Sequence, residues 1–94
     1  MAVYSIWESR FPAGNSQEGL AVTRAIWRDM LSFDGYLEHE LIEDLDDPGH
    51  LLVISRWESR EAADAALSYT SHPNAMRVKE LVSEPRRRTL GAAV

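Results

Sequence analysis

The side chains best suited to move protons at neutral pH in this chain are its histidines, because an unperturbed imidazole titrates near that pH. His72 lies beside a proline at a helix break, where a histidine either faces a pocket mouth or caps the helix. His39 lies on the same expected strand face as two leucines. A histidine in such a setting can belong to the core, to an interface or to a ligand site. His50 follows a turn, and we expect it to be solvated. His72 is therefore our candidate general base.

A second kind of chemistry is available to tyrosine and arginine, which can stabilise an oxyanion. Tyr69, Arg56 and Arg77 are the candidates. Arg56 directly precedes Trp57 in an expected strand, so the two side chains must point to opposite faces of the sheet. Arg56 therefore cannot readily share a pocket with Trp57, and Tyr69 and Arg77 remain the site candidates.

The tetrapeptide Trp-Glu-Ser-Arg occurs at Trp7–Arg10 and again at Trp57–Arg60. Each copy ends an apolar run typical of a strand and leads towards a helical pattern, so the chain divides into two similar halves. Trp57 is either a core residue or the wall of an aromatic pocket, and Trp7 can line the same cavity. Trp27, in the first helical pattern, is more simply a core residue and is kept as a candidate for ligand contact.

Length and composition describe one folded domain over residues 1–94, of which 45% are apolar. The chain has no cysteine, and its three histidines show no metal-ligand spacing, so we expect neither a metal nor a cofactor. A net charge of -5 opposes nucleic-acid binding, and we interpret Arg86–Arg88 as a solvated strand. No apolar run is long enough for a membrane span, so we expect a cytoplasmic protein without membrane partners.

The first half of the chain has the pattern of a strand followed by a helix. Val3 to Phe11 is rich in aliphatic and aromatic residues, which predicts a strand. Asn15 with Glu18 has the spacing of a capping box, which predicts the start of a helix that runs to about Ser32. Gly35 can take the left-handed conformation that ends such a helix.

The middle of the chain predicts a hairpin. Tyr36–Leu45 alternates in part, with Leu37 and His39 on one face. Asp46–Gly49 contains Pro and Gly at turn positions, so the chain folds back into an antiparallel strand at Leu51–Trp57. This strand is almost continuously apolar and should be central.

The last third predicts helices and one more strand. Ser59 can cap an alanine-rich helix, which should fail before Pro73 because proline disfavours helical geometry in the residue before it. Asn74 can cap a short third helix that reaches about Val82, and Arg86–Leu90 can supply a fourth strand.

The resulting order is β-α-β-β-α-(α)-β, the split βαβ arrangement of an α+β, ferredoxin-like fold with a four-stranded antiparallel sheet and helices on one face. We expect the first and third strands to be parallel neighbours at the sheet centre. In that arrangement the two Trp-Glu-Ser-Arg copies would lie side by side at the carboxyl ends of these strands.

Four short segments also resemble one protein family, the antibiotic-biosynthesis-monooxygenase type of the dimeric α+β barrel superfamily. They are the helix end Phe33-Asp-Gly35-Tyr36, the acidic turn Asp46-Asp-Pro48, the strand end Arg56-Trp57-Glu58-Ser59, and Thr70-Ser-His-Pro73 before the last helix. Their order spans almost the whole chain. The resemblance implies a homodimer whose two sheets close into a barrel, with a pocket between sheet and helices in each subunit.

The resembling superfamily includes cofactor-independent oxygenases of phenolic polyketides, haem-degrading enzymes and small isomerases. The residues that haem degraders use, an Asn on the first strand and a Trp and a His in the second helical region, are missing here, so we do not expect haem degradation. The quinone-forming members place a Trp where this chain has Trp57. Their Tyr early in the following helix is replaced by Ala62-Ala63, and Tyr69 is the candidate substitute. The His-Pro order of His72-Pro73 is reversed relative to isomerase-like members.

The resemblance implies a cofactor-independent monooxygenase that oxidises a small aromatic or polyketide-like molecule with O2. Without a metal or flavin, such a reaction needs a substrate anion, a base and a dry pocket. The alternatives are a non-catalytic dimeric ligand-binding protein of the same fold and a small isomerase that uses His72. The candidate catalytic residues are His72 and Tyr69, and the candidate substrate-binding residues are Trp57, Trp7, Trp27, His39 and Arg77.

Overall fold

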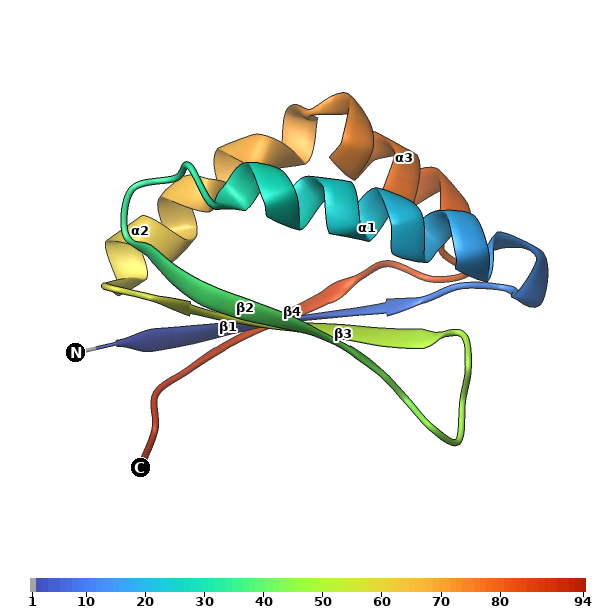
Figure 1. Cartoon of the computed structure of the whole chain (residues 1–94), viewed down its shortest axis with the longest axis horizontal. Helices are drawn as coiled ribbons and strands as arrows, with labels where there is room; N and C mark the ends of the chain where they lie inside the picture. Colours follow the sequence, from blue (N-terminus) through green and yellow to red (C-terminus); the bar gives the residue numbers. More distant parts are fainter. Residues whose placement is uncertain (1) are drawn as a thin grey trace.

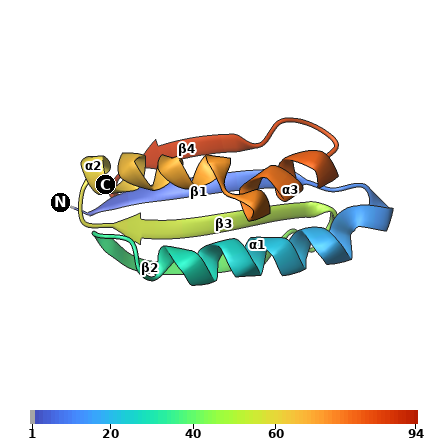
Figure 2. The same ribbon diagram turned by 90° about the horizontal axis from the view of Figure 1, so that it is seen from above.

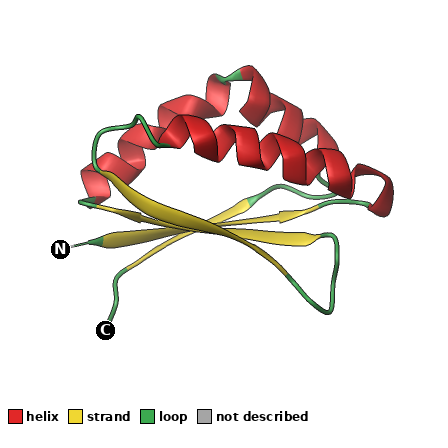
Figure 3. Cartoon of the chain, in the orientation of Figure 1, coloured by secondary structure: helices red, strands yellow, loops and turns green. Residues whose placement is uncertain are grey.

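The computed structural model describes residues 2–94 and has two layers, a sheet covered on one face by helices (Figures 1 and 3). Helices lie over only one side of the sheet, so its other face is bare within the chain (Figure 1). No helix in residues 2–94 combines the length and the apolar character needed to cross a membrane. The elements are β1 (Val3–Arg10), α1 (Ser16–Met30), β2 (Tyr36–Glu43), β3 (His50–Trp57), α2 (Arg60–Ala65), the 3-10 helix η2 (Ala66–Ser71), α3 (Pro73–Leu81) and β4 (Arg87–Gly91).

The four strands lie in the order β2-β3-β1-β4, and every neighbouring pair is antiparallel. The α+β fold with four antiparallel strands is confirmed, but the expected parallel pairing of β1 and β3 is wrong. The crossover through α1 leaves a gap between β1 and β2, and the hairpin inserts β3 into that gap with its direction reversed. Figure 2 shows β3 and β1 side by side under the helices.

The antiparallel pairing separates the two Trp-Glu-Ser-Arg copies. Trp57 lies opposite Val3, and Trp7 lies opposite Val53, so the copies end at opposite ends of the sheet and not side by side. Val53 and Trp57 are an even number of residues apart on β3, and their side chains therefore share one face. Trp7 and Trp57 consequently both point towards the helices, which is the placement on which the site depends.

Two of the four expected helix-end features are confirmed and two are wrong. Ser59 caps α2 by accepting the backbone N–H of Ala62, and Gly35 has a positive φ of 80°. Asn15 occupies the N-cap position of α1, but the expected capping hydrogen bond is absent; its amide instead donates to the carbonyl of Leu81 at 3.0 Å and ties the start of α1 to the end of α3. The cap of α3 is His72, because proline occupies the first helical position and leaves the preceding extended residue as the cap.

The second strand departs from simple alternation at its start. Tyr36 lies opposite Trp57 and Glu38 lies opposite Arg56, so the intervening Leu37 is the extra residue of a β-bulge. Leu37 is 38% exposed and does not share the buried face of His39, contrary to expectation. Arg56 points to the bare face, as expected, and its guanidinium donates to Glu38 at 3.2 Å.

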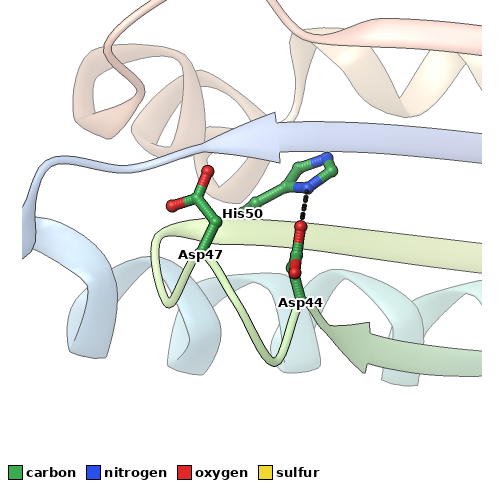
Figure 4. Close-up of side chains that lie close together, drawn as sticks. All are labelled: Asp44, Asp47 and His50. Atoms are coloured by element: carbon green, nitrogen blue, oxygen red, sulfur yellow. Dashed lines mark hydrogen bonds and ion pairs between the residues drawn. The ribbon is translucent and has the colours of Figure 1, made fainter.

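We expected His50 to be solvated, but the structure shows that it is buried. It bridges two carboxylates. Its Nδ1 lies 2.9 Å from Asp44 and its Nε2 lies 3.0 Å from Glu8 on the neighbouring strand (Figure 4 shows the Asp44 contact). Hydrogen bonds to Asp44 and Glu8 raise the pKa of His50, while burial and Arg10 oppose that rise. The same histidine lowers the pKa of Asp44. The hairpin end of the sheet is therefore held by a charged cluster.

The His50 cluster makes stability depend on pH. Because the folded pKa of His50 lies above its ordinary 6.5, its stabilising contribution is complete below pH 6.5 and is lost as pH rises through the folded value. We expect the melting temperature to fall as pH rises above 6.5, and to fall less in His50→Gln. Asp46→Asn, which removes a charge from the same turn, is the control and should keep the wild-type slope. Equal slopes for wild type and His50→Gln in a thermal scan across pH would contradict this assignment.

The positive φ of Gly35 generates a second stability prediction. A Cβ at this position would collide with the Cβ of Ala62 and would also strain the left-handed backbone. We expect Gly35→Ala to lower the free energy of unfolding by about 1–3 kcal/mol. Gly14→Ala is the matched control, because a Cβ there meets nothing within 4 Å. Urea denaturation measures both, and an equally stable Gly35→Ala protein would show that this turn tolerates a side chain.

Candidate active site

An aromatic cavity lies between the sheet and the helices, over the face of β1 and β3 to which both repeat tryptophans point. Its volume is about 50 Å³, and Trp7, Trp27, Trp57 and Tyr69 supply its aromatic walls. Four helical segments, α1, α2, η2 and α3, contribute the rest of the roof. Four candidates from separate parts of the sequence are thus brought together at one cavity.

Trp57 is the most deeply fixed wall of the cavity, with 1% of its surface exposed. Its indole Nε1 donates to Ser55 Oγ at 3.0 Å, and the Ser55 hydroxyl donates in turn to the carbonyl of Ser5 at 3.1 Å. Ser55 is equally buried, so this chain satisfies the polar atoms that burial of the indole would otherwise leave unpaired. The indole plane is therefore held in one orientation.

His39 lies behind the cavity and is not one of its lining residues. Its ring centroid is 5.3 Å from that of Trp27, and its Nδ1 is hydrogen-bonded to the Tyr36 hydroxyl at 2.5 Å. Burial lowers the pKa of His39, which keeps the ring neutral at neutral pH. Tyr36 also packs edge-on against Trp57. His39 therefore supports the aromatic walls.

Tyr69 links the cavity to the surface through its hydroxyl. The side chain is 8% exposed and lines the cavity, while its hydroxyl donates to Asp29 at the exposed end of α1 over 2.6 Å. The Asn74 amide donates to the same oxygen at 3.4 Å. Burial, followed by the hydrogen bond to Asp29, raises the pKa of Tyr69, so it remains a phenol at neutral pH. Asp29 was not a sequence candidate, since nothing in its spacing indicates this contact.

His72 contacts Tyr69 and does not line the cavity itself. The two rings are stacked, with centroids 4.4 Å apart and an interplanar angle of 9°. The Nδ1 of His72 accepts the backbone N–H of Asn74 at 3.0 Å. One ring nitrogen is thus committed to capping α3, the structural role weighed for it in the sequence, and the ring face fixes Tyr69.

Arg77 lies on the surface of α3, outside the cavity lining. Its guanidinium forms a two-point pair with Glu18 of α1, at 2.7 Å and 2.9 Å. Its side chain is 44% exposed, so it joins α1 to α3 without facing the aromatic walls. The structure therefore places His39, His72 and Arg77 around the site and the three tryptophans and Tyr69 in it.

Two arginines that the sequence interpretation placed in a solvated strand in fact line the cavity. The guanidinium of Arg86 lies 4.8 Å above the centre of the Trp7 ring, a cation–π contact. Burial lowers the pKa of Arg86, and no acidic side chain in residues 2–94 forms an ion pair with it. Arg88 lies opposite Trp7 in the β1–β4 pairing, and its Nη2 donates to Asp64 at 3.0 Å. Only Arg87 is exposed as expected.

A signal for these arginines was present in the sequence. Arg86 and Arg88 are two residues apart, as are side chains on one face of a strand, and Leu90 continues that face. The sequence alone could not decide whether this face of β4 turns towards the helices or away from them. The pairing of β4 with β1 decides it. The cavity thus combines aromatic walls with two cations, a set that suits an aromatic anion.

The residues whose geometry approaches a metal site lie elsewhere. Asp44, Asp47 and His50 could each offer a ligand atom within 4.8 Å of the others (Figure 4). Both nitrogens of His50 already have carboxylate partners, and Asp47 pairs with Arg10 at 2.5 Å. These contacts describe an ion-pair cluster at the hairpin, on which we base no metal site.

Many solved structures have the same fold, and the three described below share less than a quarter of their sequence with this chain. Rv0793 from Mycobacterium tuberculosis is 23% identical with a TM-score of 0.83, covering 100% of this chain and 96% of that one. SnoaB, a cofactor-independent oxygenase from Streptomyces nogalater solved as a mutant, is 18% identical with a TM-score of 0.84, covering 98% and 92%. A putative antibiotic biosynthesis monooxygenase from Nitrosomonas europaea is 14% identical with a TM-score of 0.84, covering 99% and 90%. At these identities the likeness establishes the fold.

No curated protein matches the sequence significantly. The family model described as antibiotic biosynthesis monooxygenase matches residues 2–78, which contain the first three strands, all of the cavity helices up to the middle of α3, and the aromatic walls. The resemblance inferred from four short segments is thereby confirmed, and the chain belongs to the antibiotic biosynthesis monooxygenase family.

Proposed function

We propose that this protein is a monooxygenase that oxidises a small phenolic molecule with O2 and uses no bound metal or flavin. The observation that carries the proposal is the hydrogen bond from Tyr69 to Asp29 at the edge of an aromatic cavity that also contains a cation without a carboxylate partner. Membership of the family supports it at the level of reaction class. The substrate has to supply the electrons, because O2 reacts readily only with an electron-rich anion.

The first step is loss of the phenolic proton of the substrate. The substrate hydroxyl donates to Tyr69 Oη, while the Tyr69 proton passes along its 2.6 Å hydrogen bond to Asp29. Asp29 is exposed, so it returns the proton to water. Each transfer breaks one O–H bond and forms another, and Tyr69 ends as it began. In this proposal Tyr69 touches the substrate, and His72 acts as a positioning residue through its stacked ring.

The second requirement is to stabilise the phenolate until it meets O2. Arg86 is fully charged despite its lowered pKa, and burial strengthens its field because little water screens it. Trp7, Trp27 and Trp57 hold the ring in an apolar setting that admits O2 and excludes bulk water. The charge of Arg86 therefore stabilises the phenolate, and the apolar tryptophan walls admit O2 to the same cavity.

The oxidation then balances without another reactant. The phenolate passes one electron to O2, and the resulting phenoxyl radical combines with superoxide at a ring carbon. Protonation yields a hydroperoxide, and loss of the C–H proton breaks the O–O bond. One oxygen atom remains as a quinone carbonyl and the other leaves as water, so phenol and O2 become quinone and water.

We also propose that two copies of the chain associate through the bare faces of their sheets. That face carries half-buried aliphatic side chains, Ile6, Leu52 and Ile54, together with Ile42, which is 38% exposed. Four aliphatic residues on an uncovered sheet face are costly to leave in water. A second copy would cover them and so complete the barrel implied by the family.

The proposed proton route generates a test of activity. With small phenols unsubstituted opposite the hydroxyl, we expect O2 uptake to match quinone formation one to one. Tyr69→Phe should lower kcat by about a hundredfold or more, because it removes the proton acceptor. Tyr4→Phe is the control; Tyr4 lies opposite Arg56 on the other sheet face and should keep the wild-type rate. An oxygen electrode with a chromatographic assay of the quinone measures both variants.

Two results would contradict the proposed reaction, and a third would contradict the role of Tyr69 in it. Turnover of the phenols without O2 would indicate an isomerase. Thermal stabilisation by the phenols with no turnover would indicate a binding protein. Unchanged O2 uptake by Tyr69→Phe would remove Tyr69 from the reaction while leaving the reaction class in place.

The proposed association has its own measurement. We expect light scattering at micromolar concentration to show twice the 10.6 kDa mass of the chain. Ile54→Glu puts a charge into the bare face and should shift the mass to that of one chain. Leu45→Glu is the matched control, since Leu45 is 97% exposed in the hairpin loop. A single-chain mass for the wild-type protein would contradict the shared barrel.

A further inference from the structure

We infer that the cavity binds a single-ring aromatic carboxylate, with the acidic group held by Arg88. This inference rests on the proposed function in one respect: it assumes that the aromatic cavity is the substrate site. It adds the size and charge of the ligand, and names a second anion contact besides the phenolate contact proposed for Arg86.

The Nε of Arg88 is the only buried side-chain nitrogen or oxygen in residues 2–94 without a hydrogen-bond partner. The side chain is 18% exposed, and Asp64 accepts from Nη2 at 3.0 Å. Arg88 lines the cavity, and its guanidinium is anchored at Nη2 while its buried Nε–H remains unsatisfied. A buried unpaired donor is destabilising unless a ligand completes it, and a carboxylate is the group that best matches a guanidinium.

The charges around Arg88 also favour an anion. Arg86 and Arg88 both line the cavity, and both lie against Trp7, one over its ring and the other opposite it in the sheet. Asp64 is the one carboxylate paired with either of them among residues 2–94, and it also lies 3.8 Å from Arg60. In a chain of net charge -5 this wall is locally positive. Such a field selects for ligand charge more than for ligand size.

The cavity volume sets the size of the ligand. The cavity volume of about 50 Å³ has room for a few water molecules. A cavity that takes up one benzene ring measures about 150 Å³, so one ring already requires the walls to yield. The short 3-10 helix η2, which contributes Leu67 and Thr70 to the lining, is the least regular of these walls. A fused three-ring ligand would require displacement of the anchored tryptophans as well.

Calorimetric titration without O2 tests this inference with three probes. Benzoate is the expected ligand, benzamide has the same shape without the charge, and anthracene-9-carboxylate has the same charge on three rings. We expect benzoate to bind at least about tenfold more tightly than either other probe, the usual effect of one charge-assisted hydrogen bond.

Matched arginine variants locate the contact. Arg88→Gln should weaken benzoate binding by about tenfold or more and leave benzamide binding unchanged. Arg87→Gln changes net charge equally on the same strand, but its side chain is exposed, and it should bind benzoate as wild type does. Because Arg88→Gln also loses its pair with Asp64, a melting curve establishes that the variant is folded, and Asp64→Asn measures the loss of that pair alone. Asp64→Asn should retain benzoate binding.

The outcomes separate this inference from the proposed function. Equal affinity for benzoate and benzamide, or equal benzoate binding by Arg87→Gln and Arg88→Gln, would overturn the carboxylate contact even if phenols were oxidised. Tight binding of anthracene-9-carboxylate would overturn the size limit. Selective benzoate binding that depends on Arg88 would support the inference even if no phenol consumed O2, a result that would count against the monooxygenase alone.

Discussion

The antiparallel pairing of β1 with β3 is the constraint on which the rest of this structure depends. It places Trp7 opposite Val53 and Trp57 opposite Val3, so that both indoles face the helices at different heights along the sheet. The space between them is what α1, η2 and α3 cover, and it becomes the cavity. A shift of β1 by one residue against β3 would turn Trp7 to the bare face while Trp57 stayed under the helices. The hydrogen-bonded chain from Trp57 through Ser55 to Ser5 crosses the same pair of strands and opposes such a shift.

Two polar side chains that line this cavity are each hydrogen-bonded to a carboxylate on the protein surface. Tyr69 reaches exposed Asp29, and Arg88 reaches exposed Asp64, so both side chains are held by a carboxylate nearer the solvent. Arg86 is different, since it lies over Trp7 without an acidic partner in residues 2–94. Burial of an unpaired cation costs free energy, and proteins retain such groups mainly where a ligand or reaction uses them. The polar and charged side chains around the cavity therefore come from helices and a strand that pack against its aromatic wall.

The fold was largely predictable from the sequence, because hydrophobic periodicity and turn residues act locally. The hairpin at Asp46–Gly49, the cap at Ser59 and the left-handed Gly35 all follow from single residues and their neighbours. The site was predictable only in part. Trp57 and Tyr69 came from patterns along the chain, whereas the contact of Tyr69 with Asp29 joins residues 40 positions apart. The cavity-lining arginines depended on which face β4 turns to β1, which alternation alone does not decide.

The central claim is that the aromatic cavity between sheet and helices is where a phenolic ligand binds and reacts. A crystal structure of the protein soaked with a phenol in the absence of O2 tests it most directly. The account predicts electron density for the ring among Trp7, Trp27 and Trp57, with the phenolic oxygen within hydrogen-bond distance of Tyr69 Oη. Density for the phenol on the bare sheet face or at the hairpin cluster of His50, with the aromatic cavity empty, would contradict it.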